Sequence, residues 1–132
     1  MLKASGKPYV IENVVGAPLE SPIMLCGSMF GLDVQRHRLF EASFPMLQPE
    51  CRHEIWKPRF PSATNRTNLR KTIEVGVYRI PLETQKRAMG IDRKITLTEL
   101  SNAIPPAYSE WIAHQWMAPM DRRLIEALGA RA

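Results

Sequence analysis

The side chains best suited to chemistry are a carboxylate and two guanidiniums, each beside an apolar run. Glu12 follows the apolar residues 9–11, and ligands of α/β sheets gather at the ends of such strands. Arg36 and Arg38 precede another apolar pair. In an extended segment these arginines share one face, where two guanidiniums can grip phosphate or base edges. From position alone, a solvated loop carboxylate and an exposed basic turn are the better interpretations.

Residues 44–71 form a segment of different character, with four prolines, many basic side chains and the aromatic residues Trp56 and Phe60. Positive charge suits phosphates and aromatic rings suit base stacking, so the segment could bind nucleic acid. A solvated surface with two partly buried rings explains it equally well. The basic side chains in question are Arg52, Lys57, Arg59, Arg66, Arg70 and Lys71.

The two cysteines, Cys26 and Cys51, are too few for a disulfide framework. Cys26 lies in an apolar run, where a thiol stays neutral, and Cys51 has no evident activating helix terminus. His37 and His53 could add metal ligands, but structural zinc sites usually use CxxC-type pairs, which are missing from the sequence. We therefore expect no catalytic thiol and no metal.

Strands are predicted by short β-rich runs. A buried strand is expected over residues 9–11, ending on Glu12, and a second strand over residues 38–43. Residues 72–78 alternate and are rich in β-branched side chains, which predicts a third strand. A loop is expected between Gly16 and Pro22.

Helices are predicted in the last third of the chain. Residues 82–89 can form a short helix that Gly90 closes. Thr96 and Glu99 match a capping box, and a further helix can begin at Pro106. Its aromatic stripe is most simply core.

Composition places the chain among small globular proteins. It has 132 residues, 45% of them hydrophobic, and a formal charge of +5, which attracts nucleic acid only mildly. Neither a signal-peptide run nor a stretch of membrane-spanning length is present. We expect a cytoplasmic protein with no membrane contact.

Three of these signals, in order, resemble motifs of the cytosine-5 DNA methyltransferases, and the surrounding residues 25–32 and 87–92 resemble the versions common in phages and prophages. Residues 12–14 read Glu-Asn-Val, like that family's motif after a strand. Arg36-His37-Arg38 is similar to its Arg-x-Arg motif. Residues 101–106 read Ser-Asn-Ala-Ile-Pro-Pro and resemble Gly-Asn-Ala-Val-Pro-Pro. Together the three resemblances span nearly the whole chain.

The resemblance implies a role for each motif. Glu12 would hydrogen-bond N3 and the exocyclic amine of a flipped cytosine, and Arg38 would contact its carbonyl oxygen. Arg36 would support Arg38 or touch the backbone, and Asn102 would lie near the cofactor, S-adenosylmethionine. The implied fold is α/β, part of a Rossmann-like methyltransferase sheet. It divides into sheet strands over 1–43, a basic insert like a target-recognition region over 44–80, and C-terminal helices over 81–132.

The sequence also departs from the family. The nucleophile there lies in a Pro-Cys dipeptide, and here no cysteine follows a proline. The glycine-rich cofactor loop is missing too, and only eleven residues precede Glu12. We therefore expect an exposed sheet edge at the first strand, covered by a second chain that supplies the missing half or by a homodimer. Three hypotheses stay open: a component of a methyltransferase that is inactive alone, a non-catalytic protein that binds DNA or regulates a methyltransferase, and a remnant.

Overall fold

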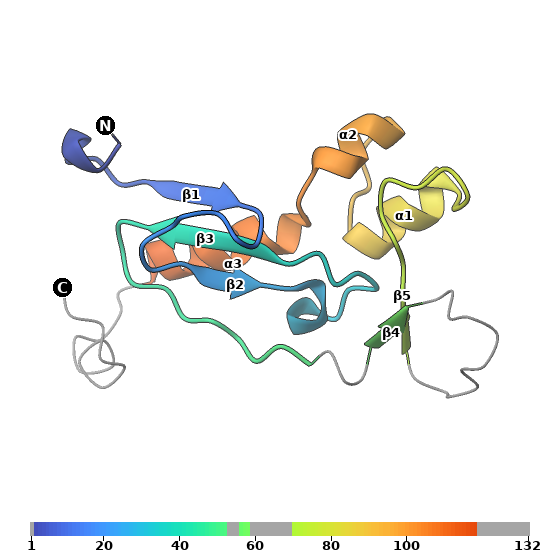
Figure 1. Cartoon of the computed structure of the whole chain (residues 1–132), viewed down its shortest axis with the longest axis horizontal. Coiled ribbons are helices and arrows are strands. Elements are labelled where there is room, and N and C mark those ends of the chain that lie inside the picture. Colours follow the sequence, from blue (N-terminus) through green and yellow to red (C-terminus); the bar gives the residue numbers. More distant parts are fainter. Residues whose placement is uncertain (1, 53–55, 59–69, 119–132) are drawn as a thin grey trace.

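The computed structural model describes residues 2–52, 56–58 and 70–118 (Figure 1). Its main sheet has the order β1-β3-β2, and both pairs of neighbouring strands are antiparallel. The strands are β1 (Val10–Asn13), β2 (Ile23–Leu25) and β3 (Arg38–Ala42). The described part of the chain is therefore a mixed α and β structure with a small antiparallel sheet, and the strand expected over 38–43 is confirmed.

Helix α3 (Pro106–Met117) packs against one face of this sheet and lies behind it in Figure 1. Side chains alternate between the faces of a strand, and Phe40 of β3 points to α3. There it packs with Leu25, Tyr108 and Ile112, and its ring centroid is 6.1 Å from that of Tyr108. As expected, α3 begins at Pro106, where a missing N–H costs nothing.

A second cluster forms around the helices α1 (Leu82–Met89) and α2 (Leu97–Asn102), and its most buried members are Met89 and Leu100. Gly90 closes α1 in the left-handed conformation, with φ of 71°. Thr96 and Glu99 form the predicted capping box at α2. Both helix signals are thus confirmed.

The strand predicted over 72–78 is wrong beyond its first residue. Strand β5 (Arg70–Thr72) ends at Thr72 and pairs in parallel with β4 (Trp56–Pro58). Gly76, with φ of 85°, then turns the chain. The fully buried side chain of Gln85 fixes this turn, because its Oε1 accepts from Gly76 N at 2.7 Å and its Nε2 donates to Ile80 O at 2.7 Å. These contacts outweigh the alternating pattern.

Strand β1 was expected to be buried, which is wrong. Val10 is exposed, and Tyr9 and Ile11 are only partly buried. Among the described strands, β1 pairs with β3 alone. Within the part of the chain that the structure describes, β1 is an edge strand, as expected. Two short 3₁₀ helices, η1 (Lys3–Ser5) and η2 (Gly27–Phe30), complete the described structure. None of its helices is long and apolar enough to cross a membrane.

Candidate functional site

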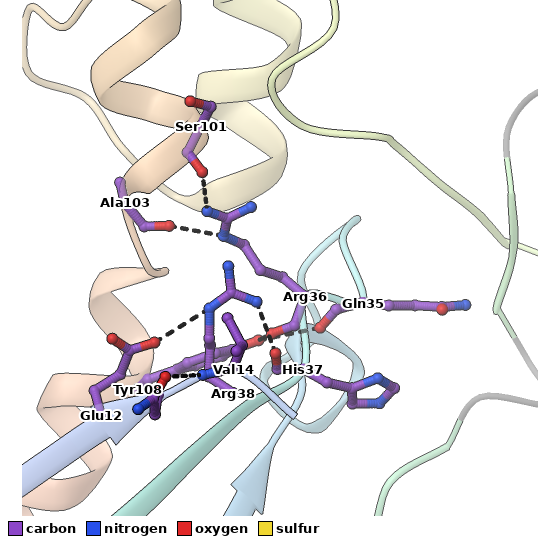
Figure 2. Close-up of polar contacts among 10 residues, drawn as sticks. Glu12, Val14, Gln35, Arg36, His37, Arg38, Ser101, Ala103 and Tyr108 are labelled. Carbon is purple, nitrogen blue, oxygen red and sulfur yellow. Dashed lines mark hydrogen bonds and ion pairs between the residues drawn. The ribbon is translucent and has the colours of Figure 1, made fainter. Parts of the chain in front are cut away.

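Glu12 and Arg38 are brought together by the register of β1 and β3. Glu12 lies opposite Phe40, and Arg38 is two residues before Phe40, so the two charged side chains are diagonal neighbours on one face. The distance from Arg38 Nε to Glu12 Oε1 is 3.1 Å (Figure 2). The Arg38 side chain is 20% exposed and that of Glu12 39%. The pair is thus formed, but solvent still reaches it.

A groove of about 470 Å³ lies beside this pair, between the sheet and α3. Its walls are mostly apolar and include Phe40, Phe44, Ile112 and Trp116, and Glu12 is the one charged side chain among its described lining residues. We call it the α3 groove. Apolar walls with a single carboxylate suit a flat ring that needs one directed polar contact.

Arg36 turns away from this pair and binds the protein backbone. Its Nε donates to Ala103 O at 2.7 Å, and its Nη2 donates to Ser101 O at 2.5 Å, at the end of α2 (Figure 2). Burial lowers the pKa of the Arg36 guanidinium, and the charge of Arg38 lowers that pKa further. The arginine remains charged, because its usual pKa is far above neutral.

The segment around Arg36 is not extended, so the alternation considered from the sequence does not hold there. Arg36 has φ of 41°, in the left-handed region that residues with a Cβ seldom adopt. The hydroxyl of Tyr108 shares its proton between Arg36 O, at 2.9 Å, and Gln35 O, at 3.1 Å. Burial raises the pKa of Tyr108, so it stays a donor at neutral pH. The strained turn is therefore held from α2 and from α3.

The three sequence motifs meet through these contacts. Arg38 of the middle motif pairs with Glu12 of the first, and Arg36 binds two carbonyls of the third. Asn102, in the third motif, is exposed at the end of α2, and its Nδ2 donates to Thr98 O at 3.1 Å. Segments almost 90 residues apart in the sequence thus interlock at one site.

The predicted DNA-binding residues are only partly described. Arg52 is exposed, with its Nε 3.7 Å from Glu50 Oε2. The backbones of Lys57, Arg70 and Lys71 lie in β4 and β5. Arg59 and Arg66 lie outside the described residues.

Sequence reasoning missed the contacts of α3. Tyr108 was read as simple core, although its hydroxyl fixes the turn at Arg36. Gln115 Oε1 accepts from Leu47 N at 2.5 Å, and Trp111 Nε1 donates to Leu47 O at 3.0 Å, so α3 also holds the chain that leaves β3. Trp116, expected in the core, is 52% exposed beside the groove. Helical spacing identified the stripe but not the polar partners.

No family model, curated protein or solved structure matches this chain. A function must therefore be argued from the geometry of the site and the three motifs.

Proposed function

We propose that this chain supplies the base-positioning part of an S-adenosylmethionine-dependent DNA (cytosine-5) methyltransferase. The observation that carries the proposal is the ion pair between Glu12 and Arg38 at the edge of the α3 groove. In the proposed fold the three antiparallel strands belong to the edge of a Rossmann-like sheet, because mixed sheets often carry antiparallel strands at an edge.

The pair has the chemistry to hold a flipped cytosine. A carboxyl group can contact ring N3 and the exocyclic amine, and a guanidinium can donate to the carbonyl oxygen on the neighbouring edge. Only one oxygen of Glu12 has a polar partner among the described residues. A base that enters the groove would form hydrogen bonds with both side chains, while Arg36 holds the start of β3 in place. In this role Arg36 is a positioning residue.

The thiol and the cofactor site must then come from elsewhere. No cysteine follows a proline in the sequence, and no cysteine lines the described part of the α3 groove. A second chain with a glycine-rich cofactor loop and a Pro-Cys dipeptide would supply both. The edge of β1 that pairs with no described strand is one place where such a chain, or a second copy, could add a strand. Asn102 would then lie near the cofactor.

A methyl-transfer assay tests the proposal. Radiolabelled S-adenosylmethionine and cytosine-containing DNA are incubated with this chain alone, with the complementary chain alone, and with both. We expect transfer only with both chains. Glu12→Gln and Arg38→Ala should each lower the rate by about 10²-fold or more, the size of effect seen when a transition-state contact is lost.

Two matched variants control for lost charge. Glu110→Gln and Arg93→Ala change exposed side chains and should keep full activity. Circular dichroism should show that all four variants are folded. Full activity of a folded Glu12→Gln or Arg38→Ala variant would refute the assigned roles. Methylation by this chain alone would refute the inference that it lacks the nucleophilic thiol.

A non-catalytic DNA-binding or methyltransferase-regulating protein is the second candidate. The net charge of +5 and the exposed Arg52 favour it. Here a gel shift should show affinity that falls steeply between two salt concentrations, because phosphate contacts release counterions. If no DNA binds even at low salt, the DNA-binding form of this candidate is removed.

A further inference from the structure

Three potential metal ligands lie close together near the start of β3, away from the Glu12–Arg38 pair. Cys26 follows β2, His37 precedes β3, and Cys51 lies in the chain that leaves β3. Their ligand atoms all lie within 4.8 Å of one another, and Cys51 Sγ is 3.8 Å from His37 Nε2. Figure 2 shows the His37 ring pointing away from Glu12 and from both arginine guanidiniums. This cluster is therefore separate from the ion pair.

We propose that Cys26, His37 and Cys51 bind one zinc ion. Zinc takes sulfur at about 2.3 Å and imidazole nitrogen at about 2.0 Å in a tetrahedron, which places ligand atoms roughly 3.5–3.8 Å apart. The distance from Cys51 Sγ to His37 Nε2 already fits. The two other distances are at most 4.8 Å, so side-chain movements of no more than about 1 Å would reach that spacing.

The ligand types select the metal. Two thiols, which become thiolates on binding, and one imidazole favour zinc over magnesium or calcium, which prefer oxygen ligands. The two protons of the thiols are released to solvent. The hydroxyl of Ser28 lies 3.2 Å from Cys26 Sγ and 3.7 Å from Cys51 Sγ, where it can donate to a thiolate and orient it. Three protein ligands leave the fourth position to water.

A bound metal would link three segments of the chain at the start of β3. His37 lies between Arg36, whose backbone is strained, and Arg38, which pairs with Glu12. A metal on His37 and on the ends of two flanking segments restrains the backbone of both arginines. The inference goes beyond the proposed function, because metal binding needs neither DNA nor a second chain.

Metal analysis of the purified full chain tests it. The protein is produced with zinc, kept reduced, desalted and analysed by mass spectrometry of the elements. We expect close to one zinc per chain, and a strong loss in Cys51→Ser and in His37→Gln. His114→Gln changes an exposed histidine on α3 and should keep the metal. Cys26 is fully buried, so metal loss in Cys26→Ser would not separate a lost ligand from lost packing, and the two other variants decide.

Cobalt substitution supplies a second readout. Co²⁺ bound by cysteine sulfur in a tetrahedral site gives intense visible and near-ultraviolet absorption, which Cys51→Ser should weaken and His114→Gln should not. No stoichiometric zinc in the wild type, or full retention in folded Cys51→Ser and His37→Gln variants, would overturn the proposal. A thiol titration must first find two free thiols per chain, because a Cys26–Cys51 disulfide would prevent metal binding.

Discussion

Arg36 offers the most direct test of how the site is held together. Replacing it with alanine removes two charge-assisted hydrogen bonds, to Ser101 O and Ala103 O. Such bonds contribute about 1.5–3 kcal/mol each when fully formed. Water reaches the half-buried site and replaces part of that loss, so we expect Arg36→Ala to lower the free energy of unfolding by about 2–4 kcal/mol.

Glycine at the same position separates the side chain from the backbone. Both variants lose the guanidinium, but the φ of 41° costs a residue with a Cβ about 1–2 kcal/mol. Glycine avoids that cost, but the greater freedom of its unfolded chain lowers the free energy of unfolding by about 0.4–1 kcal/mol. Arg36→Gly should therefore be more stable than Arg36→Ala, by about 0.5–1 kcal/mol. Arg36→Lys keeps the charge but not the planar fork, and should fall between wild type and alanine.

Urea unfolding of the four proteins, followed by circular dichroism, measures these differences. Arg93→Ala removes an exposed arginine and should change stability by less than about 0.5 kcal/mol. If Arg36→Ala is as stable as wild type, the hydrogen bonds between the second and third motifs contribute nothing to the stability of the fold. If alanine is more stable than glycine at this position, the left-handed turn does not exist in solution.

Two further predictions concern close packing and acid stability. Gly27→Ala should destabilise the fold by about 1–3 kcal/mol or more, since the added Cβ would lie 2.0 Å from the carbonyl oxygen of Val34; thermal unfolding measures this, and an unchanged midpoint would contradict the close approach. A hydrogen bond from Lys3 and one from the Glu20 backbone lower the pKa of Glu41 below its usual 4.5. Its contribution to stability is therefore complete above that value and is lost as the pH falls through the lower, folded-state pKa. Glu41→Gln should reduce the acid-induced loss of stability, and an identical pH profile for both proteins would exclude this contribution.

Local signals in the sequence predicted local structure well. Gly90, the capping box at Thr96 and the proline at 106 each set a helix boundary through contacts within a few residues, so no tertiary information was needed. The strand expected over 72–78 failed for the opposite reason. The turn that replaces this strand is held by Gln85, a buried residue in a later helix. No pattern within residues 72–78 reveals those contacts.

The site shows the same division. The side chains of Glu12 and Arg38 could be named from their motifs, and a one-residue change of register would have placed them on opposite faces. The conformation of Arg36 could not be foreseen, because its neighbours in sequence contain no glycine and its partners lie beyond residue 100. Arg36, considered from the sequence either as a ligand contact or as a support for Arg38, binds the backbone at Ser101 and Ala103.

The same reasoning explains why the cysteines were dismissed. Spacing rules find metal ligands that are close in sequence, as in CxxC pairs, whereas Cys26, His37 and Cys51 come from three segments that only the fold unites. Residues 35–38 are consequently held by α2, by α3 and by Glu12, with the cysteines at the remaining side. So many restraints on four residues beside an open groove fit a role in which Arg38 must be placed accurately before any ligand arrives. Strained residues that the surrounding structure holds in place cluster at functional sites, so the turn at Arg36 supports the proposed role.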